Sequence, residues 1–182
     1  MLYKKIVTEL FEQLHQSIES RKSEFHIANF GYNDTKNRTK IDCVVVRNIG
    51  PGFVWFHTDA RSDKVLCLKK NPTACLHFYS KKDKLQASMH TKVTLHHQNE
   101  ITAKQWSKLS NLSKMCYRQV GQPKEPYYPN LASQTLSDDE AYSNFIVVEA
   151  AIIDIDLLYL QLGDNIRYQI SLENKTCDQI LA

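Results

Sequence analysis

The chain has 182 residues, of which 42% are hydrophobic and 24% are charged. Its 23 basic and 20 acidic side chains leave a formal net charge of +3. A chain of this length is expected to form one domain that buries roughly 70% of its unfolded surface. A net charge this small is not the excess of positive charge that binding to nucleic acid or to an anionic membrane requires. Neither is therefore expected as a partner.

The apolar segments are too short to cross a membrane, since none approaches the roughly 20 residues that a spanning helix needs. The charged N-terminal stretch lacks the apolar core of a signal peptide, so we expect a soluble, cytoplasmic protein. The five cysteines include no CxxC pair and are expected to be reduced, structural thiols. The seven histidines accompany neither an HExxH motif nor a carboxylate cluster, so no metal site is expected.

The N-terminal third is predicted to form a helix followed by three strands. Apolar side chains recur every three or four residues over about residues 3–20, as on one face of an amphipathic helix. Residues 25–32 and 40–47 are rich in β-branched and aromatic side chains, and the polar stretch between them predicts a hairpin. A Gly-Pro-Gly turn at residues 50–52 leads into a third strand at residues 53–59.

The middle of the chain is predicted to contain two helices and two strands. One helix begins near Ser62 and ends before the Asn-Pro pair that precedes a strand at residues 73–80. The clearest alternation of apolar and polar residues, at residues 84–97, predicts a long strand with one polar face. Residues 101–119 have the apolar spacing of a helix.

The C-terminal part is predicted to be a long loop followed by strands. Residues 121–143 contain three prolines and a polar tail, which favours a loop. Residues 144–162 begin with apolar side chains on both faces, as in a buried strand, and a second strand is expected to start near Leu157 after a bend. Residues 166–171 and the end of the chain complete the sheet.

This succession of strands with short connections and few helices predicts a mainly β protein (α+β). We expect a closed or nearly closed antiparallel barrel, because a barrel leaves no exposed strand edges. The barrel is expected to comprise residues 25–97 and 144–182 of a single domain over residues 1–182. The helices at residues 3–20 and 101–119 are expected to lie at its periphery.

A group of residues that can bind an anion is predicted where two strands end and a helix begins. Arg47 ends the second strand, His57 and Thr58 end the third, and Ser62 and Lys64 open the helix that follows. A helix N-terminus offers unpaired amide groups and a partial positive charge, which favour a phosphate. Each residue also has a purely structural interpretation, as a helix cap, a solvated charge or an edge residue. No GxSxG, P-loop or GxGxxG motif accompanies them.

These segments resemble a known family. The order is VVVR at residues 44–47, GFVWFHTDARSDKVLCLKKNPTACLHFY at 52–79 and LQASMHTKV at 85–93. This order resembles the pyridoxamine 5′-phosphate oxidase-like family of flavin mononucleotide (FMN) split barrels. In that family a strand ending in V-x-x-[RK] is followed by [FY]-x-T-x-x-x-S-x-K, by N-P-x-x-x-L-x-F-[YF] and by a strand that begins with Gln. The YLQL and QILA segments near the C-terminus match more loosely.

The resemblance implies a split antiparallel β-barrel that binds FMN in a groove between the two subunits of a homodimer. It implies an FMN-dependent oxidoreductase in which the flavin accepts a hydride from a small-molecule substrate, while the catalytic residues stay unknown. The implied cofactor-binding residues are Val46 and Arg47 along the flavin, His57 and Thr58 at the ribityl-phosphate tail, Ser62 and Lys64 at the phosphate, Gln86 at the polar edge of the ring and Arg167 near the flavin or substrate.

Two positions depart from the family pattern. The oxidases commonly carry arginine where this chain has Asp42, and they read Ser-Arg-Lys where it has Ser62-Asp63-Lys64. A unit charge about 5 Å away is worth roughly 3 kcal/mol at an effective dielectric constant of 20. We expect Asp63 to point outward, as a first-turn carboxylate can, and Asp42 to lie away from the phosphate, because it is an odd number of residues from Arg47.

Two alternatives stay open. The first is a non-catalytic module that binds or stores FMN. The second is a haem-binding relative on the same barrel, in which His57, His77 or His90 would matter. The grip that the oxidases use for the substrate's phosphate is not found, since Ile166-Arg167-Tyr168 lacks the histidine of their Arg-x-His motif. The resemblance therefore assigns no substrate.

Overall fold

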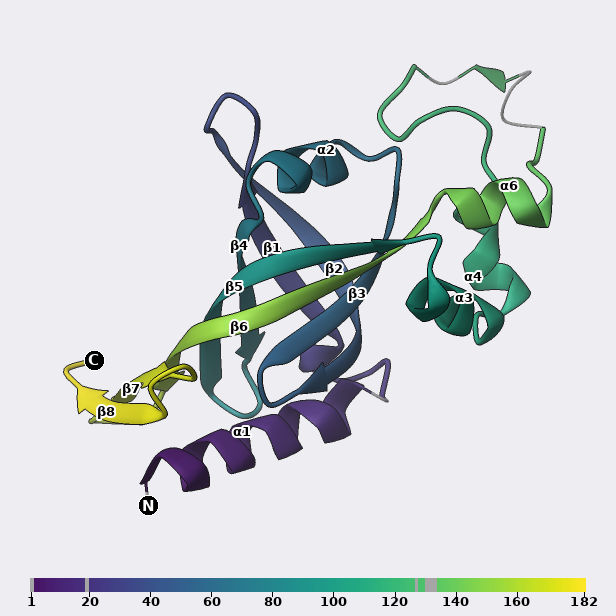
Figure 1. Cartoon of the computed structure of the whole chain (residues 1–182). Helices are drawn as coiled ribbons and strands as arrows, with labels where there is room; N and C mark the ends of the chain where they lie inside the picture. The colour runs from purple at the N-terminus through teal and green to yellow at the C-terminus, as the bar shows by residue number, and fades with distance from the viewer. Residues whose placement is uncertain (1, 19, 127, 130–133) are drawn as a thin grey trace.

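The computed structural model describes residues 2–18, 20–126, 128–129 and 134–182 (Figure 1). Its main feature is an eight-stranded antiparallel sheet in the order β3-β2-β1-β4-β5-β6-β7-β8. An additional β3–β6 pairing closes the first six strands into a barrel. The strands are β1 (Ile27–Asn33), β2 (Thr39–Gly50), β3 (Phe53–Asp59), β4 (Thr73–Ser80), β5 (Leu85–His97), β6 (Phe145–Tyr159), β7 (Ile166–Ser171) and β8 (Thr176–Ile180). The prediction of a mainly β antiparallel barrel is confirmed.

The barrel interior is filled by alternate side chains of each strand. On β5, Leu85, Ala87 and Met89 are buried, and the polar side chains between them face outward. Aromatic rings from β1 and β3, the two neighbours of β2, meet in the interior, with the ring centroids of Phe30 and Phe56 4.8 Å apart. The alternation at residues 84–97 therefore distinguishes the inside from the outside of the barrel, as predicted.

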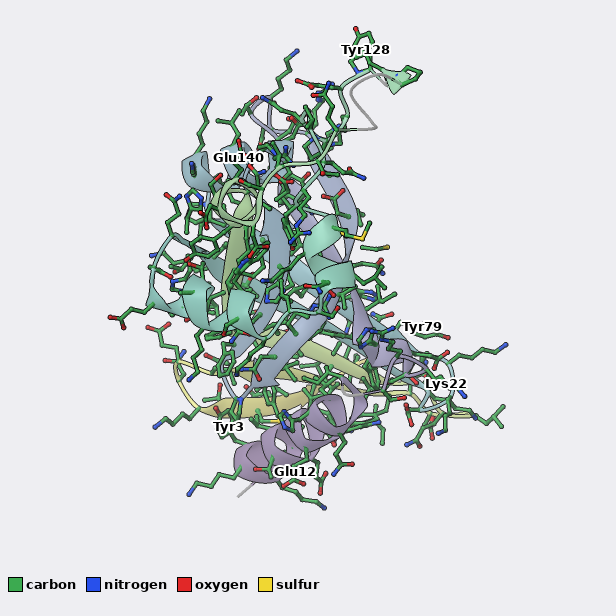
Figure 2. All side chains as sticks on the ribbon, turned by 90° about the vertical axis from the view of Figure 1, so that its right-hand side faces the viewer. Tyr3, Glu12, Lys22, Tyr79, Tyr128 and Glu140 are labelled. Atoms are coloured by element: carbon green, nitrogen blue, oxygen red, sulfur yellow. The ribbon has the colours of Figure 1, made fainter. Side chains whose placement is uncertain are left out.

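Helix α1 (Leu2–Ile18) lies across one end of the barrel (Figure 1). Its apolar face includes Leu10 and Leu14, which have no exposed surface. Its polar face carries Glu12, which Figure 2 shows at the lower end of the molecule. The short η1 helix (Glu24–His26) then leads into β1. The predicted amphipathic helix is confirmed, and its role is to cover the barrel end.

Strands β7 and β8 lie outside the six-stranded barrel, which differs from the predicted barrel segment 144–182. Strand β3 pairs with β6 only as far as Ala151, so the later part of β6 is free to pair with β7. Strand β6 also runs unbroken to Tyr159, whereas a new strand was expected near Leu157. The strand bends at a β-bulge formed by Ile153, because one extra residue kinks a strand without ending it.

In the part of the chain that the structure describes, three short helices lie between β5 and β6, namely α3 (Glu100–Ser107), α4 (Asn111–Met115) and α6 (Asp138–Ser143). The single helix expected over residues 101–119 is divided into α3 and α4, and α6 lies within residues 121–143, where a loop was expected. Helices α3 and α6 pack on the start of β6. A capping box between Ser137 and Glu140 fixes the start of α6. Trp106, Tyr117, Phe145 and their neighbours form a second apolar cluster here, which explains why β6 begins with apolar residues on both faces. Among the described residues, no helix is both long and apolar enough to cross a membrane.

Candidate functional site

The barrel is split between β2 and β3. The two strands pair from Gly50 and Phe53 only as far as Val46 and Phe56, and a bulge at Arg47 interrupts even this ladder. Beyond this point β2 pairs with β1 alone and β3 with β6 alone. Helix α2 (Asp63–Lys70) begins just after β3 and lies at this end of the barrel (Figure 1). The split therefore brings the ends of both strands close to the start of a helix.

A hollow of about 350 Å³ lies in the split. Three of the predicted phosphate and tail residues, Thr58, Ser62 and Lys64, line it together. Arg47 is not among its lining residues. The full lining comprises Tyr32, Asp42, Cys43, Thr58, Asp59, Ser62, Asp63, Lys64, Pro123 and Lys124.

The start of α2 presents hydrogen-bond donors to this hollow. Ser62 occupies the N-cap position, but its side chain does not cap the helix. The Ser62 hydroxyl instead donates to the backbone carbonyl of Asp59 over 2.8 Å. The first amides of a helix have no partner within the helix. Together with the ammonium group of Lys64, they give this end of the hollow a donor-rich surface.

Asp42 also lies in the hollow, and the expectation that it lies away from the phosphate site is wrong. Its Oδ2 is 2.9 Å from Lys64 Nζ and accepts a hydrogen bond of 3.3 Å from the Tyr32 hydroxyl. Residues 42 and 47 do face opposite sides of β2, but the inward side at this end of the strand faces α2. Asp63 is exposed, as expected, yet it too lines the hollow and contacts Lys124 Nζ at 3.2 Å.

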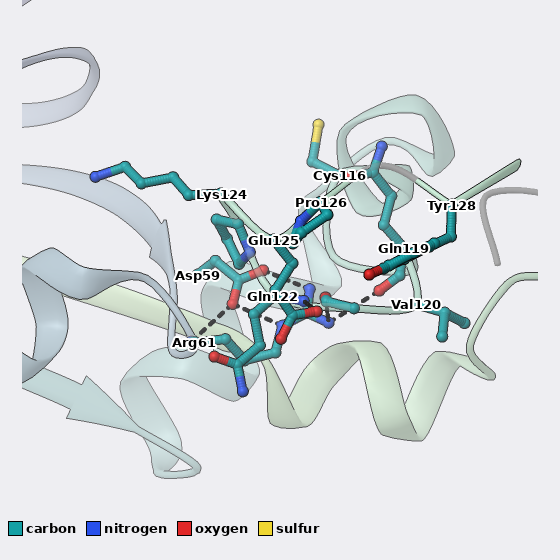
Figure 3. Close-up of a pocket in the computed structure, with 12 residues that line it drawn as sticks. Asp59, Arg61, Cys116, Gln119, Val120, Gln122, Lys124, Glu125, Pro126 and Tyr128 are labelled. Atoms are coloured by element: carbon teal, nitrogen blue, oxygen red, sulfur yellow. Dashed lines mark hydrogen bonds and ion pairs between the residues drawn. The ribbon is translucent and has the colours of Figure 1, made fainter.

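Arg61 holds the segment 119–126 beside the hollow through hydrogen bonds. The sequence does not indicate these contacts. The Nε and Nη2 atoms of Arg61 donate to the Asp59 carboxylate over 2.9 and 2.6 Å. Its Nη1 donates to the carbonyls of Gln119 and Gly121 over 2.9 and 2.7 Å (Figure 3). The hydrogen bond to Asp59 raises the pKa of Arg61. A second hollow of about 320 Å³ lies between this arginine and the segment.

Replacing Arg61 should loosen this segment. We expect Arg61→Ala to lower the free energy of unfolding by about 1–2 kcal/mol, because a partly buried guanidinium that donates to four acceptor atoms is lost. Amide hydrogen exchange across residues 119–126 should accelerate in the same variant. Arg38→Ala is the matched control, since Arg38 also pairs with an aspartate but lies exposed. Equal losses in the two variants, with no change in exchange, would contradict this role for Arg61.

The outer face of β3 carries two buried ring nitrogens without a hydrogen-bond partner among the described residues. They are Trp55 Nε1 and His57 Nε2. The His57 ring packs edge-on against Phe145, with centroids 4.8 Å apart. Burial, together with the charge of Arg47, lowers the pKa of His57 to about 3, so the ring is neutral near pH 7. Arg47 itself is exposed beside the split.

Gln86 and Arg167 lie away from the hollow within one copy of the chain. Gln86 on β5 pairs with Leu158 on β6, and Leu158 pairs with Arg167 on β7, so all three side chains share the outer face. Strands β4 and β1 separate Gln86 from β2, which corresponds to about 14 Å of sheet. Arg167 forms a two-point ion pair with Asp156, and this contact raises the pKa of Arg167.

Neither a protein-family model nor a curated protein sequence matches the chain. Solved structures do match it. A pyridoxamine 5′-phosphate oxidase-related, FMN-binding protein from Nostoc punctiforme PCC 73102 has a TM-score of 0.78 at 16% identity, over 96% of this chain and 95% of that one. PhzG from Burkholderia lata 383, in complex with tetrahydrophenazine-1-carboxylic acid, has a TM-score of 0.76 at 14% identity, over 97% and 92%.

A third match is a protein related to general stress protein 26, of the pyridoxinephosphate oxidase family, from Clostridium acetobutylicum. Its TM-score is 0.58 at 15% identity, over 94% of this chain and 98% of that one. The chain has the split-barrel fold. At these sequence identities the likeness establishes the fold. The resemblance seen in the sequence is therefore confirmed as a resemblance in fold.

The outer face of β3 and the hollow in the split differ in how well they fit the parts of an FMN molecule. On the outer face, Arg47 and the unpartnered nitrogens of Trp55 and His57 suit a planar ring with polar edges. Inside the hollow, Lys64 and Lys124 each contact a carboxylate already. The residues therefore fit the ring and a hydrogen-bonding tail, without the excess of positive charge that favours a phosphate dianion.

Proposed function

We propose that the protein binds a flavin, FMN in the first instance, in the split of the barrel and acts as a flavin-dependent oxidoreductase. The observation that carries the proposal is the convergence of Thr58, Ser62 and Lys64 on one hollow in the split of the barrel. The fold of an FMN-binding protein that matches nearly the whole chain supports it.

The residues around the split have distinct proposed roles. Arg47 and Trp55 can donate hydrogen bonds to the carbonyl oxygens of the flavin ring. Thr58, Ser62 and Lys64 would hold the ribityl tail in the hollow. When bound, the flavin supplies the electron transfer, and the protein positions it and controls the charge around it.

A second copy of the chain would complete the site. Gln86 and Arg167 lie on the outer face of the sheet, too far from the hollow to reach it within one copy. The same face exposes Ile27, Ile41 and Tyr79, which are 51%, 69% and 47% exposed. Apolar side chains gathered on an exposed face indicate a contact surface. We therefore propose a homodimer in which each copy supplies Gln86 and Arg167 to the flavin of the other.

The absorbance spectrum of the protein as isolated tests the proposal. We expect flavin bands, with mass spectrometry identifying the molecule released on denaturation. Protein without colour, which also fails to quench the fluorescence of added flavin, contradicts flavin binding. A Soret band would instead favour the haem-binding alternative.

The oxidoreductase part is tested separately, on protein loaded with flavin. Aerobic turnover with release of peroxide is the expected result for at least one reductant, with pyridoxamine 5′-phosphate and reduced nicotinamide nucleotides as the first to be offered. Flavin that stays oxidised with every reductant would favour the non-catalytic, flavin-storing module.

A further inference from the structure

The charges in the hollow of the split are balanced in pairs. Lys64 contacts Asp42 at 2.9 Å, and Lys124 contacts Asp63 at 3.2 Å. The third carboxylate of the lining, Asp59, is bound by Arg61. Lys64, Lys124 and Arg61 therefore each have an acidic partner in the lining of the hollow.

Asp42 is held in this position rather than free to swing away. The Tyr32 hydroxyl donates to the same carboxylate oxygen that contacts Lys64. Tyr32 is buried at 4% exposure, and burial together with Asp42 raises its pKa, so the hydroxyl stays a donor. The Lys64 and Asp42 side chains are only 15% and 33% exposed, which limits how far solvent screens them.

A phosphate dianion gains little in such a hollow. Its attraction to Lys64 and Lys124 is opposed by repulsion from Asp42 and Asp63, which are in direct contact with these lysines and carry the opposite charge. An uncharged hydroxyl tail meets no such repulsion. The hydroxyl groups of such a tail can donate to the two carboxylates and to the Ser62 oxygen, and they can accept from the first amides of α2.

We propose that this split barrel holds its flavin by the ring and the ribityl hydroxyls, and that the terminal phosphate adds no affinity. Riboflavin is then as good a ligand as FMN, and Asp42 and Asp63 are the residues that set this specificity. The inference rests on the proposed flavin binding and specifies which flavin the site accepts.

Titration of flavin-free protein with riboflavin and with FMN, followed by quenching of flavin fluorescence, tests the inference. We expect dissociation constants within about threefold of each other. In Asp42→Asn the affinity for FMN should rise about tenfold while that for riboflavin stays the same, because one repulsive charge is removed. In Lys64→Gln the affinity for FMN alone should fall about tenfold.

Two further variants keep the test independent of folding effects. Asp63→Asn removes the more exposed carboxylate and should also raise the affinity for FMN selectively. Asp164→Asn, an equal change of charge in the turn between β6 and β7, should alter neither affinity.

The outcomes separate this inference from the proposed function. FMN that binds the unaltered protein 30-fold or more tightly than riboflavin overturns the inference and leaves flavin binding intact. FMN affinity that stays unchanged in both Asp42→Asn and Asp63→Asn also overturns it. Binding of neither flavin to the unaltered protein overturns the proposed function, and this inference with it.

Discussion

Ile27→Glu should convert the proposed dimer into a monomer. Ile27 lies at the start of β1 on the exposed outer face, and in a two-fold interface each substitution occurs twice. A buried glutamate at a central contact costs about 2 kcal/mol per copy, so the dimer dissociation constant should rise roughly a thousandfold. Sedimentation velocity over a range of protein concentrations measures this shift.

The same variant should lose its flavin, because each proposed site needs residues from both copies. Leu112→Glu is the matched control, since Leu112 is 74% exposed on α4, away from the proposed interface. It should remain dimeric and keep its flavin affinity. A monomeric Ile27→Glu protein with unchanged flavin affinity would show that one copy forms the whole site.

Acid should destabilise the flavin-free protein through His57. Burial lowers the pKa of His57 in the folded state to about 3, against an ordinary value of about 6.5 in the unfolded chain. Between these values the unfolded state binds more protons, so stability falls as the pH falls below 6.5 and is intact above it. At pH 4.5 the loss from this group amounts to about 3 kcal/mol.

Urea unfolding at pH 7 and pH 4.5 measures this contribution as a difference between variants. His57→Phe fills a similar volume against Phe145 and should lose about 2–3 kcal/mol less than the unaltered protein over this range. Other acid-sensitive groups contribute equally to both proteins and cancel. His97→Phe, at an exposed position, is the control and should retain the full pH dependence. An unaltered pH dependence in His57→Phe would mean that His57 is protonated at little cost in the fold.

Strong local signals allowed several elements to be predicted to the residue. Strands β3 and β4 are bounded by Gly-Pro-Gly and Asn-Pro turns, and both run over the predicted residues 53–59 and 73–80. Turn chemistry of this kind acts on the local backbone, so it can be read without knowledge of the fold. Helix α6 escaped prediction because its six residues are mostly polar and show no apolar period, and only its capping box marks it.

The candidate site was also predictable only where its residues lie close together in the sequence. The residue types at the start of α2 were recognisable because Thr58, Ser62 and Lys64 lie close together in the sequence and at fixed spacing. Asp42 was misplaced because strand parity gives the side of a strand but not which element covers that side. The contacts of Lys124 and Arg61 join residues about 60 positions apart, and no local pattern encodes them.

The order of apolar and polar residues alone specified a barrel with an amphipathic helix beside it, because burial of alternate side chains is a property of each strand taken separately. The tertiary structure decided where the barrel opens, which strands lie outside it and which acidic and basic side chains form ion pairs. Those features depend on pairings between distant segments, and Coulomb interactions act over distances in space that the sequence does not record.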